Sequence, residues 1–183
     1  FFRDIGSTPV NKVTLNGILS TLKKALEYWA AIDAVESGMR ERVLLPDIDD
    51  AEAARDRYLQ QDDAEAILEY LNRFRYASRD HVIVALLWHT GMRLGSLRAL
   101  DVDDIDLEEG CFDLWHRPES GTPLKNGNAA ERSVAIGPHY VEVLSDYLEH
   151  HRHEVEDEYG REPLVTSAQG RLSPSPIRLT CYQ

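Results

Sequence analysis

Cysteine, lysine and long apolar segments are all scarce in this chain of 183 residues. Its two cysteines, Cys111 and Cys181, are too few for a disulfide scaffold and fit a reducing, intracellular setting, so we expect the protein in the cytoplasm. No run of about 18 apolar residues is present, and we therefore expect neither a membrane-spanning helix nor a membrane partner. A glycine-rich phosphate loop is also missing from the sequence.

Acidic residues dominate the charge, because 32 Asp and Glu outnumber 20 Lys and Arg and give a net charge of −12. Only four of the basic residues are lysines, and much acid with little lysine predicts a halophilic protein; an ordinary acidic protein kept soluble by its charge is the alternative. A negative net charge argues against a nucleic-acid partner, because clustered Lys and Arg bind phosphates. The charge is uneven, however: residues 1–46 carry 6 basic and 5 acidic side chains, whereas residues 47–183 carry 14 and 27.

Hydrophobic spacing separates a short N-terminal part from the rest of the chain. Apolar residues recur at helical intervals over residues 14–36, which predicts one amphipathic helix with Thr14 as its N-cap and Gly38 as its stop. The segment 46–58 contains Pro46 and several acids but few apolar residues, and this composition is typical of a linker.

The second part, from residue 59 onward, shows helical periodicity interrupted by short alternating segments. The expected helices begin near Asp62, Ser78, Leu94, Pro138 and Ser173, and the expected strands cover 105–107, 111–115 and 132–136. The helix from Pro138 is expected to reach Glu158. The predicted fold class is therefore mainly α with a small antiparallel β-sheet (α+β).

The most informative segment is Thr90 to Leu100, which reads Thr-Gly-Met-Arg-Leu-Gly-Ser-Leu-Arg-Ala-Leu. Gly91 is expected to end one buried helix and Leu94 to start the next, which would place Arg93 on a tight turn between them. A guanidinium held there is a rigid, two-pronged donor for phosphate oxygens that stays charged at any working pH. An arginine after a glycine is, taken alone, more often a solvated turn residue or the partner of a nearby acid.

This segment resembles the first catalytic box of the tyrosine recombinase (phage integrase) family, in which an Ala/Leu-rich helix, Thr-Gly-x-Arg, a Leu-spaced helix and Asp-Ile-Asp follow one another. The resemblance implies that Arg93 holds the scissile phosphate of DNA. Leu124-Lys125 and the segment 132–136 resemble the hairpin that presents the family's catalytic lysine, which implies that Lys125 protonates the 5′-oxygen leaving group. Ser96 departs from the family, which usually has a supporting acidic residue at this position.

The same resemblance divides the chain into domains. Residues 1–45 would be the C-terminal part of a helical core-binding (DNA-clamping) domain, 46–58 its linker, and 59–183 the N-terminal part of the catalytic domain. The expected DNA-binding residues are the lysines of the first part and one arginine near the catalytic box: Lys12, Lys23, Lys24 and Arg98. Arg98 has two alternative interpretations, a contact with the DNA backbone or a surface ion pair.

The remaining catalytic groups of the family are a His-x-x-Arg box and a tyrosine nucleophile. None of the seven histidines has an arginine three positions later, and Tyr182 comes before the box should appear, so we do not assign it as the nucleophile. We expect these parts beyond Gln183 and therefore expect the chain to be a fragment that is inactive on its own.

No metal or other cofactor is expected. His150, His151 and His153 predict an exposed helix end, because adjacent histidines on a helix point in different directions. The stretch Asp101–Glu109 has six acids in nine positions and is interpreted as a solvated loop. Cys111 is interpreted as core packing in a strand.

The resemblance implies site-specific recombination or integration of double-stranded DNA through a 3′-phosphotyrosyl intermediate, with self-association as a tetramer on DNA. An alternative of a different class is a non-catalytic DNA-binding regulator with a helix-turn-helix around residues 82–100. A third interpretation, an acidic helical interaction module, fits the charge but leaves the arginine box unexplained.

Overall fold

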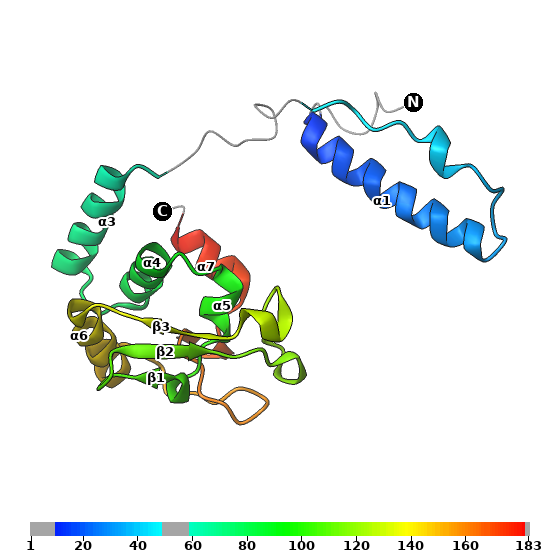
Figure 1. Cartoon of the computed structure of the whole chain (residues 1–183). Coiled ribbons are helices and arrows are strands. Elements are labelled where there is room, and N and C mark those ends of the chain that lie inside the picture. The colour runs from blue at the N-terminus through cyan, green and yellow to red at the C-terminus, as the bar shows by residue number, and fades with distance from the viewer. Residues whose placement is uncertain (1–9, 49–58, 182–183) are drawn as a thin grey trace. The chain divides into compact units, whose positions relative to one another are not determined.

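The computed structural model describes residues 10–48 and 59–181. The chain divides into two compact units, Phe1–Tyr58 and Leu59–Gln183 (Figure 1). Most of the predicted linker, residues 49–58, lies outside the described residues. The interpretation of the first 45 residues as part of a DNA-clamping domain stays a prediction.

The first unit is built on one long helix, α1 (Lys12–Ala31), followed by a short 3-10 turn at Arg40–Arg42. Asn11 caps the helix, because its side-chain oxygen accepts a hydrogen bond from the Val13 N–H at 2.8 Å. The prediction of Thr14 as the cap was therefore wrong. The prediction of Gly38 as the stop was also wrong, because Asp33 has a φ of 54°, which a continuing α-helix does not allow.

The apolar side of α1 is mostly exposed, although its spacing is that of an amphipathic helix. Leu26 is the one α1 residue that counts as buried, while Ile18 is 52% and Trp29 43% exposed. Trp29 is therefore not a core residue. A single helix with one short turn beside it offers too little surface to bury such a face.

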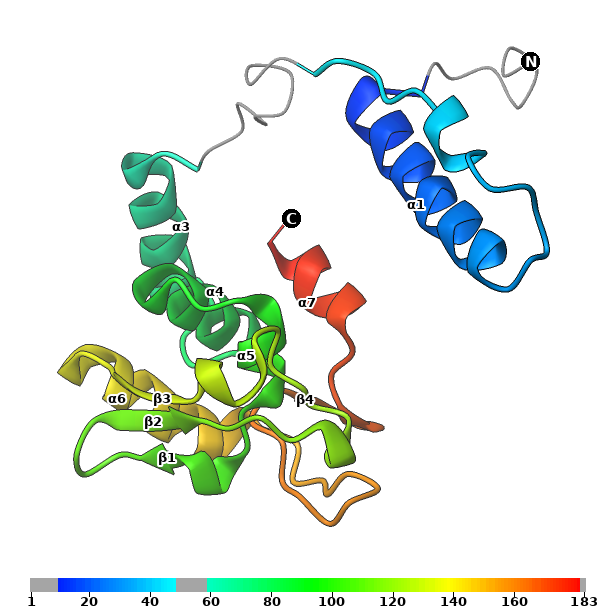
Figure 2. The same ribbon diagram turned by 45° about the vertical axis from the view of Figure 1, so that its right-hand side comes forward.

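The second unit has five α-helices and two small antiparallel sheets among its described residues (Figures 1 and 2). The helices are α3 (Gln61–Phe74), α4 (Arg79–Thr90), α5 (Leu94–Ala99), α6 (Pro138–Asp146) and α7 (Pro174–Thr180). The strands are β1 (Ile105–Asp106), β2 (Cys111–Leu114) and β3 (Arg132–Ala135) in one sheet, and β4 (Thr166–Ser167) and β5 (Gly170–Arg171) in the other. The predicted class, mainly α with a small antiparallel sheet, is confirmed.

The strand β2 runs through the middle of its sheet, with β1 on one side and β3 on the other. Phe112 lies opposite Ile105 of β1 and Val134 of β3. Side chains alternate along β2, so Phe112 and Leu114 enter the core while Cys111 is only partly buried on the other face. The interpretation of Cys111 as core packing was therefore wrong.

The core of the second unit surrounds α4, whose Val82, Ile83 and Leu86 are almost fully buried. Tyr147 follows α6 and donates its hydroxyl to the Leu164 carbonyl at 3.1 Å, which satisfies the polar end of a buried ring. The helix that starts at Pro138 ends in a π-helical turn at His151, well before the predicted Glu158. Within the described ranges, no helix is both long and apolar enough to cross a bilayer.

The N-terminus of α4 is held by an unusual buried histidine. Ser78 caps the helix as predicted, and its hydroxyl accepts the His81 N–H at 3.2 Å. The Nδ1 atom of His81 accepts the Ala77 N–H at 3.3 Å, and Ala77 itself has a φ of 50°. Burial, followed by the nearby charge of His139, lowers the pKa of His81 below its usual value.

We expect the free energy of unfolding to fall as the pH drops below about 6.5, because the unfolded chain then binds a proton that the folded His81 resists. The loss approaches 1.4 kcal/mol per pH unit until the lowered native pKa is reached. Urea unfolding at pH 7.5 and 5.5 measures it. His81→Gln, which stays neutral, should lose less stability over this interval than the natural chain, and an equal loss in both proteins would contradict the assignment.

Candidate active site

Arg93 lies at the junction of two packed helices, as predicted. Gly91 ends α4 with a φ of 59°, and its N–H donates to the Leu87 carbonyl at 3.1 Å. Thr90 closes the turn, because its hydroxyl donates to the Leu86 carbonyl at 2.6 Å and accepts the Met92 N–H at 3.2 Å. Arg93 is the N-cap of α5, so its backbone is fixed by the helix while its side chain is exposed.

The carbonyl of Arg93 starts the hydrogen bonding of α5. It accepts the N–H groups of Ser96 at 2.8 Å and Leu97 at 3.1 Å. Leu97 is fully buried and Ser96 is 7% exposed, so the underside of this turn rests on the core. Ser96 occupies the position where the family's acid was expected, and its hydroxyl adds no charge beside Arg93.

Lys125 lies at the tip of the connection between β2 and β3, beside the buried Leu124. The tip is tied down by His116, whose Nδ1 accepts the Leu124 N–H at 2.9 Å. The His116 N–H donates to the Glu131 carboxylate at 3.0 Å, which links the two sides of the connection. The Lys125 side chain is exposed above this support. Sequence reasoning missed the role of His116, because a lone histidine at a strand end gives no signal of its own.

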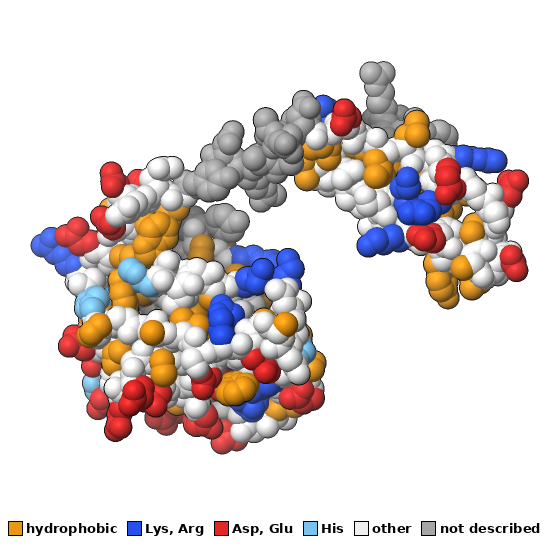
Figure 3. Space-filling model, in the orientation of Figure 1, with side chains coloured by type: hydrophobic (Ala, Val, Ile, Leu, Met, Phe, Trp, Pro, Cys, Tyr) orange, Lys and Arg blue, Asp and Glu red, His pale blue; other side chains and the backbone are white. Residues whose placement is uncertain are grey.

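Three basic side chains among the described residues of the second unit are unpaired. Among residues 59–181, the side chains of Arg93, Lys125 and Arg178 have no hydrogen bond, ion pair or ring contact with another described residue. Arg178 lies in the last turn of α7, which packs against α4 and α5. Figure 3 shows basic side chains over α5 and α7, whereas acidic side chains gather toward the β1 edge. Sequence reasoning missed Arg178.

Arg98 is half-buried rather than a surface residue. Its Nη1 donates to the Gly121 carbonyl at 2.9 Å, and its Nε is buried without a partner among the described residues. Burial, and then the charge of Arg171, lowers the pKa of Arg98 below its usual value. The open choice of a surface ion pair was therefore wrong, because the guanidinium bonds a backbone carbonyl.

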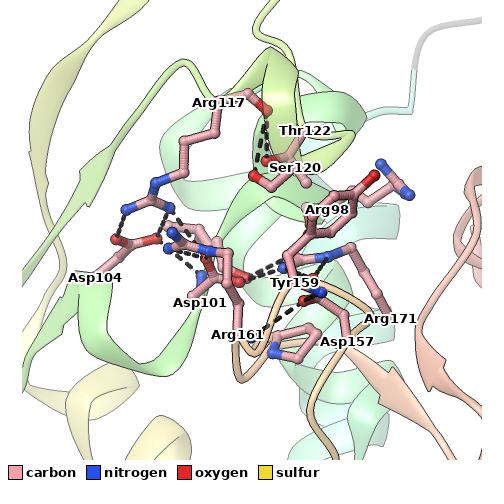
Figure 4. A network of polar contacts seen from close by, with 12 residues as sticks. Arg98, Asp101, Asp104, Arg117, Ser120, Thr122, Asp157, Tyr159, Arg161 and Arg171 are labelled. Carbon is pink, nitrogen blue, oxygen red and sulfur yellow. Dashed lines mark hydrogen bonds and ion pairs between the residues drawn. The ribbon is translucent and has the colours of Figure 1, made fainter.

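The acidic stretch 101–109 is not uniformly solvated, which corrects the interpretation of a solvated loop. Asp101 is 2% and Asp104 7% exposed, and both lie in the network of Figure 4. Arg117 donates to Asp104 through Nη1 at 2.8 Å and Nη2 at 2.5 Å, and to Asp101 at 3.1 Å. The hydrogen bond that Arg117 donates to Asp104, opposed by burial, raises the pKa of Arg117 above its usual value. Arg161 also pairs with Asp101.

Arg171 of β5 joins the same network from the other side. Its Nη2 contacts Asp101 at 2.5 Å and Asp157 at 2.7 Å, and its Nη1 donates to the Arg98 carbonyl at 2.8 Å. Burial opposes ionisation of Asp157, but hydrogen bonds from Arg171 and from the Arg161 and Tyr159 backbones prevail and lower its pKa. This network gives the segment a structural role that its composition does not reveal.

The predicted DNA-binding lysines lie on α1 in the first unit. Lys12 and Lys24 are exposed and Lys23 is half-buried. His150 and His151 end the π-helical turn after α6. In the part of the chain that the structure describes, no group of three or more His, Cys, Asp or Glu side chains is placed to hold a metal ion.

Comparison with known proteins gives a consistent result. A model of the phage integrase family matches residues 57–178. The tyrosine recombinase XerC of Staphylococcus aureus (strain MSSA476) is 26% identical over 149 residues, which cover 79% of this chain and 44% of the relative. The chain thus spans less than half the length of this curated relative.

Two solved structures have the same fold. The structure of a lambda integrase dimer bound to a COC′ core site superposes with a TM-score of 0.63 at 17% identity, covering 93% of this chain and 44% of the integrase. The Tn1549 transposon integrase in complex with transposon right end DNA gives a TM-score of 0.61 at 15% identity, over 87% of this chain and 52% of that one.

Proposed function

The chain belongs to the phage integrase family of tyrosine recombinases, and we propose that it supplies DNA binding and the arginine and lysine half of the active site in a site-specific recombinase. The substrate is double-stranded DNA in the cytoplasm, on which the enzyme assembles as a tetramer. The His-x-x-Arg box and the tyrosine come from a longer protein that contains these 183 residues. The chain on its own therefore binds DNA without cutting it.

The observation that carries this proposal is the state of Arg93. Its backbone is anchored between Met92, which is 5% exposed, and α5, while its guanidinium has no partner among the described residues. Arg117 and Arg171 of the same unit, by contrast, pair with the buried Asp101. An anchored but unpaired guanidinium suits a ligand that brings its own negative charge, such as a DNA phosphate.

The chemistry exchanges one phosphorus–oxygen bond for another. The tyrosine hydroxyl gives up its proton as its oxygen bonds to phosphorus, the bond to the 5′-oxygen breaks, and the released oxygen takes a proton. Negative charge grows on the nonbridging oxygens of the phosphate. Arg93 stabilises this charge, and because its position is already fixed it does not have to move during the reaction. Lys125 carries the proton to the 5′-oxygen as a general acid.

The N-terminal unit acts in this proposal as part of the core-binding domain, which grips the DNA. Lys12, Lys23 and Lys24 of α1 contact its phosphates. Lys12 and Lys23 lie on the same side of the helix, because eleven residues correspond to about three turns. The surplus acid of the chain lies after residue 46, and residues 1–46, which hold these lysines, carry 6 basic and 5 acidic side chains.

The geometry of α5 disfavours the helix-turn-helix regulator. A recognition helix needs several exposed side chains that reach base edges in the major groove. In the six residues of α5, Ser96, Leu97 and Ala99 are buried, and Arg98 bonds the Gly121 carbonyl. Such a helix has almost no surface with which to read bases.

The test uses the longer recombinase and a nicked suicide substrate. After cleavage, the short fragment that bears the 5′-hydroxyl diffuses away, so the step cannot be reversed. We expect a covalent protein–DNA adduct that survives denaturing electrophoresis, while the 183-residue chain binds the same DNA and forms no adduct. Sequence-specific binding by the longer protein without any adduct would overturn the proposal in favour of a regulator.

We expect Lys125→Ala to slow cleavage by about 10²–10⁴-fold, because the 5′-oxygen then leaves without a proton. A substrate with a 5′-thiol leaving group needs no general acid and should restore the rate, as measured by adduct formation over time. The matched control is Lys24→Ala, whose effect should lie in DNA affinity and should be the same for both substrates. Failure of the thiol to rescue Lys125→Ala would remove this lysine as the general acid.

A further inference from the structure

The strongest unassigned feature of the second unit is the buried charge network of Figure 4. We propose that Arg98 and Arg117 are positioning residues, which hold the helix that carries Arg93 at a fixed place relative to the hairpin that carries Lys125. The functional meaning of this placement rests on the proposed recombinase activity. The placement itself is a property of the fold and can be measured without DNA.

The first step is the anchoring of α5 at its C-terminal end. Arg171 donates to the Arg98 carbonyl at 2.8 Å and to the Leu100 carbonyl at 3.4 Å, so a guanidinium caps the end of the helix whose other end bears Arg93. The same side chain pairs with Asp101 directly after the helix. Its side chain is 6% exposed, so solvent competes little for these bonds.

The second step is the connection from α5 to the base of the hairpin. The Nη1 atom of Arg98 donates to the Gly121 carbonyl at 2.9 Å, which is a direct bond between the two elements. A second connection runs through Arg117, which follows β2 and binds Asp101 and Asp104 with its guanidinium. The Arg117 N–H and carbonyl are paired with Thr122, so the side chain and the backbone of one residue link the acids to the hairpin.

The third step is the choice of side chains. An arginine fork bound to carboxylates fixes direction as well as distance, which apolar contacts do not. Asp101 is 2% exposed, and charges this deeply buried are screened little by salt. The network therefore suits a site in which Arg93 and Lys125 must keep a constant distance at salt concentrations that weaken surface ion pairs.

The experiment measures this spacing in the whole chain by paired spin labels and pulsed electron resonance. The labels occupy Arg93→Cys and Lys125→Cys, with the natural cysteines replaced as Cys111→Ser and Cys181→Ser. We expect one narrow distance distribution that becomes about twofold wider in Arg98→Met and in Arg117→Met. The matched control is Arg75→Met, which removes an exposed ion pair with Asp80 and should leave the width unchanged.

All distributions are recorded well below each variant's unfolding temperature, so a loss of stability alone does not widen them. If Arg117→Met fails to fold, Arg98→Met still removes the direct bond while the pairs of Asp101 and Asp104 remain. Arg117→Lys should widen the distribution too, because one ammonium does not reproduce the fork. Unchanged widths in the Arg98 variant, or equal widening in the Arg75 control, would overturn the proposal. The distance measurement does not depend on recombinase activity. The positioning role of Arg98 and Arg117 and the proposed recombinase function can therefore be disproved independently of each other.

Discussion

Replacing Arg93 by alanine is expected to lower the formation of the covalent DNA adduct in the longer recombinase by about 10²–10³-fold. The guanidinium is fixed in place and faces charge that grows only in the transition state, so its removal should act on the chemical step. Equilibrium DNA binding should change far less. One lost phosphate contact lowers the slope of log affinity against log salt by about 1.

Two variants separate this expectation from a general loss of charge. Arg93→Lys keeps the positive charge but loses the two-pronged geometry, so we expect it to remain strongly impaired in cleavage. Arg73→Ala removes an exposed arginine of α3 whose recorded contact is with the Phe74 ring, and it should cleave normally. If Arg93→Ala formed the adduct at the natural rate, the assignment of the site would be wrong.

The largest expected effect on stability comes from Asp101→Asn, with a loss of about 3–5 kcal/mol in the free energy of unfolding. The substitution keeps the shape of the side chain but leaves Arg161 without its carboxylate and removes one of the two carboxylates that Arg117 and Arg171 each bind. In a unit of this size, such a loss lowers the unfolding temperature by roughly 10–20 °C. Calorimetry or circular dichroism during heating measures it.

Asp103 offers a matched control, because it belongs to the same acidic run but is exposed. Asp103→Asn should change the free energy of unfolding by about 0.5 kcal/mol or less. If the whole acidic run were a solvated loop, Asp101→Asn and Asp103→Asn would instead change the free energy of unfolding by similar, small amounts. Comparable shifts in the two variants would contradict the buried network.

Local sequence signals predicted the elements that depend on neighbouring residues. Ser78 and Gly91 bound α4 as predicted, because a cap and a left-handed glycine act within one helical turn. The strands at 111–115 and 132–136 were also predicted, since both segments alternate, and the structure pairs them as β2 and β3. The ends of α1 were missed, because several residues near each end were equally good caps or stops.

Local sequence signals could not predict that Asp101 and Asp104 are buried. Their partner Arg117 comes 16 and 13 residues later, and Arg171 comes 70 residues after Asp101. Nothing in a run of acids shows which of its members turn inward, because that depends on side chains that the fold brings from elsewhere. A run of acids near several arginines is therefore compatible with both a solvated and a buried state.

Net charge was a poor guide to the distribution of unpaired basic side chains for a related reason. Nine of the Lys and Arg side chains in residues 59–181 have a recorded partner within the chain, most of them a carboxylate or a backbone carbonyl. Arg93, Lys125 and Arg178 have no such partner among the described residues, and Figure 3 shows basic side chains over α5 and α7. The net charge of −12 counts paired and unpaired basic side chains alike, although only the unpaired ones are available to a phosphate.

The bond between Arg171 and the Arg98 carbonyl also sets an order of events during synthesis, because 73 residues separate its two ends. At about 5–20 residues per second, a ribosome needs some 4–15 s to add the second end after the first. In that interval α5 has emerged without the group that caps it. A nascent chain therefore completes the anchoring of α5 only after Arg171 has been added, late in the synthesis of this unit.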